Sequence, residues 1–141
     1  MEELAQTFFE ISQTAYQFGS PWTVEQFASD LIQPHSHYLT EGIENCAFLG
    51  FQQVCDEIEI TNIASIDKGQ GYGRKLMKQL LQRAESQAIA NIFLEVRASN
   101  QEARLFYETF GFQEIGIRKN YYQHPQEHAI LMSLKVGNTN E

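Results

Sequence analysis

Cysteine is scarce in this chain of 141 residues, which has only two, Cys46 and Cys55. Two cysteines cannot build a disulfide framework or a zinc site by themselves, and both lie in apolar, strand-like sequence where a small buried side chain is expected. The four histidines are not grouped with carboxylates or cysteines, and Pro125 interrupts the helical spacing between His124 and His128. The sequence therefore predicts no metal site and no redox role.

Basic residues and long apolar runs are also scarce. Ten lysines and arginines stand against 18 aspartates and glutamates, which gives a formal net charge of −8. This balance argues against a nucleic-acid binder and suits a cationic substrate attracted by the negative field. No apolar run approaches the length of a membrane span, and the first residues, Met-Glu-Glu, are acidic where a signal peptide would be basic. We therefore expect a cytoplasmic protein with no membrane partner.

The composition that is present suits one folded unit. Apolar residues make up 43% of the chain and aromatic residues 12%, which is enough for one sizeable core. The sequence contains no internal repeat, linker or low-complexity segment. We therefore expect a single domain over residues 1–141, in which residues 137–141 form a polar tail.

Hydrophobic periodicity predicts an α+β fold. The first expected elements are helices over about 2–17 and 24–32, followed by strands over 38–42, 46–54 and 57–65. A helix over about 70–87 and a strand over 91–97 come next. The last elements are a helix that begins at a Ser99-x-x-Glu102 capping box and ends at Gly111, and strands over 112–122 and 128–136. The strand over 91–97 follows a crossover helix, so it should run parallel to the strand that ends at residue 65. The sheet is therefore expected to be mixed, mostly antiparallel, with a central parallel pair flanked by helices.

The stretch TNIASIDKGQGYGRKLM, residues 61–77, reads as a strand, a glycine-rich turn and the start of a helix. The first N–H groups of a helix have no intrahelical partner, so a phosphate can bind there if glycines let the backbone approach it. Arg74 and Lys75 add positive charge in the first turn. The stretch is not a dinucleotide fingerprint, because Arg74 stands where GxGxxG needs a glycine, and it is not a Walker A loop. It indicates either an anion site or a plain glycine turn.

Two further residues have side chains suited to catalysis. Glu95 lies in an otherwise apolar strand, on the same face as Phe93 and Arg97. It is either a catalytic carboxylate or the partner of Arg97 in an ion pair. Tyr107 lies on the inward stripe of the next helix, either as a core aromatic residue or as a catalytic phenol. The residues alone leave both alternatives open.

The order of these pieces resembles the GCN5-related N-acetyltransferases (GNAT). The resemblance spans roughly Tyr16 to Leu134, and its most specific parts are LEVRASNQEARLFYETFGF and RKNYY. More narrowly, the chain is similar to bacterial ribosomal-protein-alanine N-acetyltransferases of the RimI type. The resemblance implies the GNAT fold, acetyl-CoA as the acetyl donor, and as acceptor the N-terminal α-amine of a protein, with a ribosomal protein beginning with alanine as the best candidate.

The resemblance also assigns roles to single residues. Glu95 would be the general base, acting through water, and Tyr107 would be the general acid for the departing thiolate. Acetyl-CoA would be bound by Ile63, Ala64, Ser65, Lys68, Gly69, Gln70, Gly71, Tyr72, Gly73, Arg74 and Asn100. The acceptor groove would be walled by Trp22, Tyr121 and Tyr122. Backbone N–H groups at the strand end would stabilise the oxyanion.

The sequence departs from the family pattern in one segment. Residues 65–69 are about two residues shorter than the usual family loop, and Lys68 stands where glutamine or arginine is usual. Two other functions stay open at this point. In the first, the acceptor is a small amine, such as a polyamine or an antibiotic. In the second, the domain senses a CoA thioester without catalysis, although the presence of both Glu95 and Tyr107 weighs against a sensor.

Overall fold

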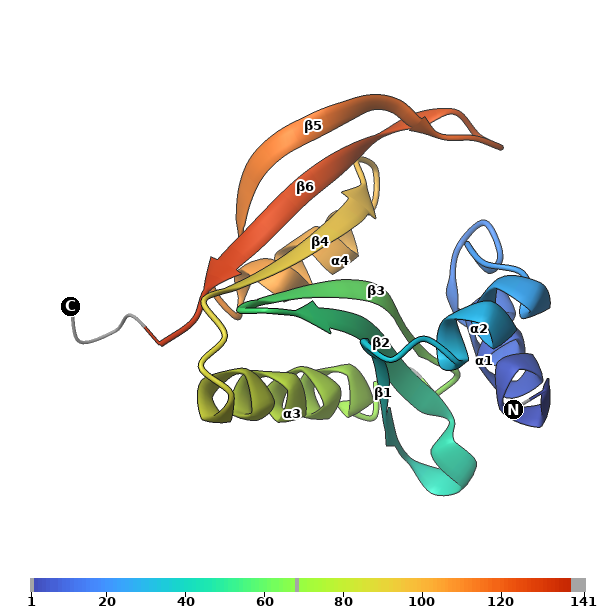
Figure 1. Ribbon diagram of the computed structural model, residues 1–141. Coiled ribbons are helices and arrows are strands. Elements are labelled where there is room, and N and C mark those ends of the chain that lie inside the picture. Colours follow the sequence, from blue (N-terminus) through green and yellow to red (C-terminus); the bar gives the residue numbers. More distant parts are fainter. Residues whose placement is uncertain (1, 68, 138–141) are drawn as a thin grey trace.

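The computed structural model describes residues 2–67 and 69–137 of the chain (Figure 1). Its helices are α1 (Glu2–Ala15), α2 (Val24–Leu31), α3 (Tyr72–Ser86) and α4 (Gln101–Glu108), with a short 3-10 turn at Ile43–Asn45. Its strands are β1 (Ser36–Glu41), β2 (Ala47–Val54), β3 (Glu57–Ser65), β4 (Asn91–Arg97), β5 (Gln113–Tyr122) and β6 (Glu127–Lys135). In the described ranges no helix is both long enough and apolar enough to cross a membrane.

The six strands form one sheet in the order β1-β2-β3-β4-β6-β5. The first three make an antiparallel meander, and β6 pairs antiparallel with both β4 and β5. Only β3 and β4 are parallel, because the crossover helix α3 connects them. The predicted fold class, a mostly antiparallel sheet with a central parallel pair, is confirmed.

The first residues of α2 and α4 are set by N-terminal caps, one of them formed by local contacts and the other shifted by a tertiary contact. The helix predicted over about 24–32 is present as α2 and begins with a capping box, since Thr23 Oγ1 accepts from the N–H of Gln26 and the Gln26 side chain accepts from the N–H of Thr23. The predicted cap of α4 is wrong by one residue. Its cap is Asn100, whose Oδ1 accepts from the N–H of Ala103 at 3.1 Å, while the N–H of Ser99 donates to Glu127 on the neighbouring hairpin. A tertiary contact therefore decides where this helix starts.

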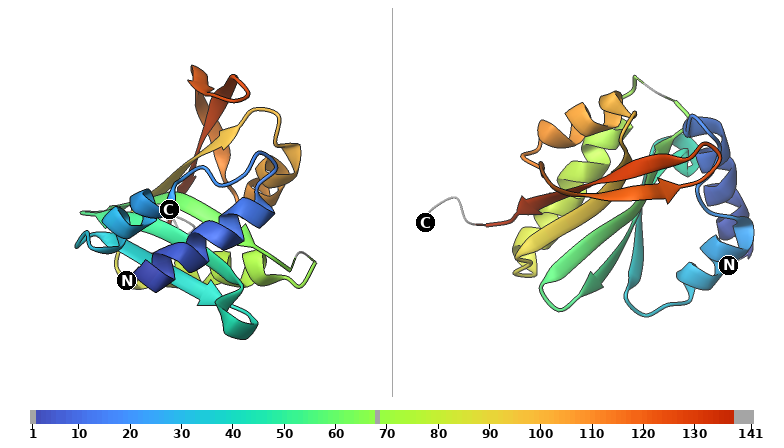
Figure 2. Two further views of the ribbon diagram at one scale, coloured as in Figure 1. Left: turned by 90° about the vertical axis from the view of Figure 1, so that its right-hand side faces the viewer. Right: turned by 90° about the horizontal axis from the view of Figure 1, so that it is seen from above.

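Helices cover both faces of the sheet and build two apolar cores. On one face, α3 and α4 contribute Leu80 and Tyr107, which pack in a cluster with Leu49, Ile92 and Met132. On the other face, α1 lies across the β1–β3 half of the sheet, as the left view of Figure 2 shows. There the rings of Phe8 and Phe48 stack with centroids 4.4 Å apart. The second face of β4, β5 and β6 is left without a covering helix.

The sheet opens between β3 and β4. Their parallel pairing covers only Glu57–Glu59 against Asn91–Phe93, although β3 continues to Ser65. On the other side of β3, Phe51 pairs with Ile60 and Gly50 with Asn62, so Thr61 is an extra residue that forms a β-bulge. The bulge bends β3, and Figure 1 shows the two strands meeting at one end and diverging at the other. The carboxyl-terminal part of β3 therefore has a backbone edge without a strand beside it.

Candidate active site

The glycine loop forms an open cradle at the start of α3. Gly69 and Gly71 have φ of +84° and +76°, a region that suits glycine, and Gly71 is the N-cap residue of the helix. A Cβ at either position would meet no atom within 4 Å, so the space above the helix N-terminus is free. The first turn of α3 has no acidic residue. This arrangement fits a phosphate group.

The other loop positions differ in their surroundings. A Cβ on Gly73 would lie 3.5 Å from the ring of Phe106, an ordinary van der Waals contact, so α3 packs against α4 at this position. The guanidinium of Arg74 lies 5.0 Å above the ring of Phe110, which places its charge beside the cradle. Gln70 is exposed, and Tyr72 is the first residue of α3. The predicted contact at Lys68 lies outside the described residues.

The three residues of β3 that were predicted to contact acetyl-CoA, Ile63, Ala64 and Ser65, lie at the carboxyl-terminal end of this strand. The N–H of Ile63 does not donate to β2 but to the hydroxyl of Tyr16, at 3.1 Å. Ala64 pairs with β2 and is buried, and the Ser65 hydroxyl donates to the carbonyl of Asp67. Asn100 uses its side-chain oxygen to cap α4, so the amide NH₂ is the part left to contact a ligand. Ile63 therefore lies on the open backbone edge of β3.

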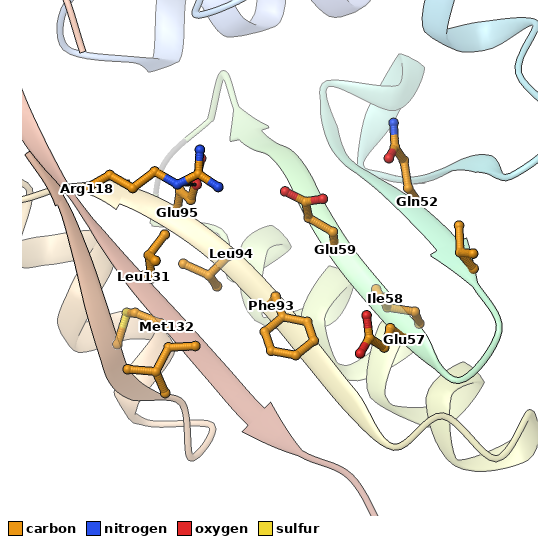
Figure 3. A pocket seen from close by; sticks show the side chains of 12 residues that line it. Gln52, Glu57, Ile58, Glu59, Phe93, Leu94, Glu95, Arg118, Leu131 and Met132 are labelled. Carbon is orange, nitrogen blue, oxygen red and sulfur yellow. Dashed lines mark ion pairs between the residues drawn. The ribbon is translucent and has the colours of Figure 1, made fainter. Parts of the chain in front are cut away.

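A pocket of about 330 Å³ lies on the face of the sheet that has no covering helix. Three carboxylates line it, from Glu57, Glu59 and Glu95, together with the guanidinium of Arg118. Figure 3 shows the Glu59 and Glu95 side chains rising from neighbouring strands above an apolar floor that includes Phe93. The pocket is therefore acidic and suits a cationic group with an apolar neighbour.

Glu95 is fixed by an ion pair, but not by the one that the sequence suggested. Its Oε2 lies 2.9 Å from Nε of Arg118 on β5, and its side chain is 19% exposed. Arg97 instead pairs with Glu127 at 3.0 Å, and its guanidinium stacks between the rings of Phe18 and Tyr122. The alternative of a Glu95–Arg97 pair is wrong, because Arg97 lies next to the β5–β6 hairpin while Arg118 reaches Glu95 across the pocket.

Glu59 is a site residue to which the sequence analysis assigned no role. It pairs with Phe93 in the parallel register, which places it one strand away from Glu95. Burial and the charge of Glu95 raise the pKa of its carboxyl group, and Arg118 lowers it. It forms no ion pair within the described ranges. The signal that would have found it is the predicted parallel pairing, combined with the alternation of glutamates along β3.

Tyr16, Tyr107 and Tyr122 come from distant segments of the chain, and their hydroxyl groups interact electrostatically near the open end of β3. Tyr107 is buried against Phe106 and Phe112, and burial, then Tyr16, then Tyr122 raise its pKa above the usual value. Burial raises the pKa of Tyr16 to about 12, although the hydrogen bond from Ile63 lowers it. These phenols therefore stay protonated at neutral pH, and Tyr107 can act as a proton donor.

None of the three aromatic residues predicted to wall the acceptor groove is in the lining of the acidic pocket. Tyr121 and Tyr122 lie at the end of β5 with ring centroids 5.2 Å apart, and burial followed by the Glu95 charge raises the pKa of both hydroxyls. Trp22 packs on Phe27 and lines a different hollow of about 410 Å³ beside α2. The two hollows share Gln52 in their linings. Trp22 is therefore a neighbour of the acidic pocket and not one of its walls.

The arrangement separates two kinds of binding site. A cradle suited to an anion lies at the N-terminus of α3, and an acidic pocket lies on the opposite face of the sheet, over β3 and β4. Glu95 faces the pocket, while Tyr107 lies on the cradle side in the core of α3 and α4. In residues 2–67 and 69–137, no three His, Cys, Asp or Glu side chains gather as a metal site would require. Such a site can pass a group from an anionic donor to an amine.

Known proteins resemble this chain in sequence and structure. The family model described as Acetyltransferase (GNAT) domain matches residues 11–124. The [ribosomal protein bS18]-alanine N-acetyltransferase of Escherichia coli K12 is 39% identical over 135 residues, which cover 92% of this chain and 89% of that protein. The protein of the same name from Salmonella typhimurium is 37% identical with the same coverage.

One solved structure is similar to this chain in both fold and sequence. The crystal structure of the ribosomal-protein-S18-alanine N-acetyltransferase from Escherichia coli aligns with a TM-score of 0.84 and 34% sequence identity. The alignment covers 96% of this chain and 91% of that one. The similarity therefore extends over nearly the whole chain and shows the same fold.

Proposed function

Because the chain belongs to the GNAT acetyltransferase family, we propose that it acetylates the N-terminal α-amine of a protein, and that this protein is a ribosomal protein beginning with alanine. The chain is an acetyltransferase, and acetyl-CoA is its acetyl donor. The observation that carries the proposed acceptor is the acidic pocket on the face of the sheet opposite the cradle, with Glu95 above it. Such a pocket attracts a protonated chain end.

The cradle and the β3 edge are the proposed donor site. The N–H groups at the start of α3 would bind the pyrophosphate, with Gly69 and Gly71 giving access and Arg74 adding charge. The edge from Ile63 to Ser65 and the amide of Asn100 would contact the pantetheine and acetyl portions. When bound, acetyl-CoA supplies a thioester carbonyl that an amine can attack. The chain's own residues then only need to move two protons.

Glu95 is the proposed general base. A peptide α-amine has a pKa near 8, so it needs little help to lose its proton at neutral pH. Arg118 orients the Glu95 carboxylate over the pocket, and a water molecule would carry the proton from the amine to it. Glu59, on the neighbouring strand, would hold a cationic side chain of the acceptor beside the reacting amine.

Tyr107 is the proposed general acid. The departing thiolate has a conjugate acid with a pKa near 8.5, so it can take a proton from a phenol as the carbon–sulfur bond breaks. The pKa of Tyr107 is raised mainly by burial, which keeps its proton in place at neutral pH. The family resemblance supports both catalytic assignments, and the two side chains lie on opposite faces of the sheet.

The proposal also covers the domain organisation of the enzyme and its location in the cell. Residues 1–141 would form one acetyltransferase domain that acts in the cytoplasm, where acetyl-CoA and new ribosomal proteins are both present. The predicted polar tail of residues 137–141 lies, apart from Gly137, outside the described residues.

The cradle assignment predicts that Gly71→Val lowers the affinity for acetyl-CoA by at least about tenfold. The branched side chain would occupy the open space at the helix N-terminus where the pyrophosphate is expected. Isothermal titration calorimetry measures the change. The matched control is Gly137→Val, because Gly137 also has a positive φ, of +70°, and no atom within 4 Å of its Cβ position. Equal binding by both variants and the parent would contradict the cradle.

The proposed acceptor predicts a clear order in a panel of substrates. Peptides that begin with alanine and carry a basic or aromatic residue soon after should be acetylated on the α-amine, and lysine side chains and polyamines should react much more slowly. Mass spectrometry with fragmentation locates the acetyl group. In the variant Glu59→Gln, the KM for peptides with a basic second residue should rise about threefold to tenfold, since one charged contact is lost.

The same panel separates the two alternative functions. A kcat/KM for spermidine or an aminoglycoside comparable to that for the best peptide would support a small-amine acetyltransferase in place of a protein N-terminal one. Binding of acetyl-CoA without turnover of any acceptor would support a sensor.

A further inference from the structure

Tyr16 holds a backbone group of the open strand edge. It is the first residue after α1, and its own N–H donates to the carbonyl of Ser12 at 3.0 Å, which continues the helical turn. Its side chain reaches β3, where its hydroxyl oxygen accepts a hydrogen bond of 3.1 Å from the N–H of Ile63. From the sequence, Tyr16 was expected only near the end of the helix over about 2–17. The structure gives its hydroxyl a specific partner.

The N–H of Ile63 needs this partner because of the way the sheet opens. Beyond Glu59 and Phe93, β3 no longer pairs with β4, so no strand can accept from this N–H. A buried N–H without an acceptor costs about 1–3 kcal/mol. The phenol of Tyr16 meets that need in the absence of ligand.

The neighbouring residue shows that this end of β3 has unmet hydrogen-bonding capacity. Asn62 is 2% exposed, and neither polar atom of its side-chain amide has a partner in the described part of the chain. Buried amides are nearly always satisfied, so an unsatisfied one beside an open strand edge is expected where a ligand completes the site. The hydrogen bond from Ile63 to Tyr16 therefore lies next to a buried side chain whose polar atoms have no partner in the described residues.

We propose that the Tyr16 hydroxyl is a placeholder for the acetyl oxygen: it accepts from Ile63 N–H in the free enzyme and is displaced when acetyl-CoA binds. This inference rests on the proposed function, under which the β3 edge at Ile63 receives the acetyl group. One N–H can make only one good linear hydrogen bond, so the phenol oxygen and the acetyl oxygen compete for it. CoA has no acetyl oxygen and leaves the contact in place. Tyr16 thus tunes how strongly the site prefers acetyl-CoA to CoA.

The segment that carries Tyr16 is suited to such an exchange. Tyr16 lies at the start of the turn between α1 and α2, where Gly19 has a φ of +83°. Phe18, two residues later, packs its ring on the guanidinium of Arg97 at 4.8 Å, so the turn touches β4 on the far side of the gap. Tyr16 is also close enough to Tyr107 and Tyr122 to raise the pKa of each. The released hydroxyl would remain among the catalytic groups.

The test is Tyr16→Phe, with the affinities for acetyl-CoA and CoA measured by calorimetry. Removing the competing oxygen should raise the affinity for acetyl-CoA about threefold to tenfold and leave the affinity for CoA unchanged. The control is Tyr38→Phe, which also removes a hydrogen-bonded tyrosine hydroxyl, one that donates to Asp30 away from the gap. It should change neither affinity.

A second measurement uses the unchanged chain, in case Tyr16→Phe does not fold. The backbone amide resonance of Ile63 should shift much further on addition of acetyl-CoA than on addition of CoA, because only acetyl-CoA exchanges the acceptor of this N–H. A fall in acetyl-CoA affinity in Tyr16→Phe, equal changes in affinity for both ligands, or Ile63 shifts of equal size with both ligands would overturn the placeholder. Failure of the unchanged enzyme to bind either ligand would instead count against the proposed function.

Discussion

Replacing Glu95 by glutamine is expected to lower kcat by about 10²- to 10⁴-fold, while the affinity for acetyl-CoA stays the same. Glutamine keeps the size of the side chain, and its carbonyl oxygen can still accept from Arg118. It cannot take up a proton, so the amine loses its proton acceptor in the transition state. Steady-state kinetics with the best peptide and calorimetry with acetyl-CoA measure the two quantities.

A matched control separates the loss of a base from the loss of an ion pair. Glu114 is also in an ion pair, with Arg104 of α4, but its side chain does not line the acidic pocket. The variant Glu114→Gln should keep its full turnover. If Glu95→Gln retained activity within about twofold of the parent, Glu95 would be only a structural partner of Arg118.

The variant Tyr107→Phe is expected to lower kcat by about 10²- to 10³-fold with little change in donor affinity. Phenylalanine keeps the ring contacts with Phe106 and Phe112, so the core is preserved and only the hydroxyl is lost. Because burial raises the pKa of Tyr107 above its usual value, the phenol of the parent enzyme stays protonated, and its kcat should not fall between pH 7 and 9 through loss of this proton.

The role of Tyr107 as an acid can be separated from a role in packing by changing the leaving group. An acetyl thioester of a more acidic thiol needs less protonation as it departs, so the defect of Tyr107→Phe should shrink with such a donor. A packing defect would reduce the reaction of both donors equally. If Tyr107→Phe lowered the rate equally with both donors, Tyr107 would be only a core aromatic residue and not the general acid.

Much of this architecture follows from local signals in the chain. The period of the apolar residues sets each helix and strand, and the length of the crossover helix makes β3 and β4 parallel. The glycines at 69 and 71 predicted the open turn before α3, because their conformation is a local property. The resemblance to the GNAT family added the catalytic assignments of Glu95 and Tyr107, which periodicity alone left open.

Only the tertiary structure decided which side chains meet. The partner of Glu95 is Arg118, 23 positions away, and not Arg97 on its own strand, because the β5–β6 hairpin places Arg118 across the pocket. Glu59 became a site residue through the strand register, and Tyr16 through the divergence of β3 from β4, which leaves the Ile63 N–H without a strand partner. The sequence by itself determined the elements and the open glycine turn, since these depend on neighbours a few residues apart. The ion pair, the second carboxylate and the Tyr16 contact depend on how distant strands diverge, which no local pattern encodes.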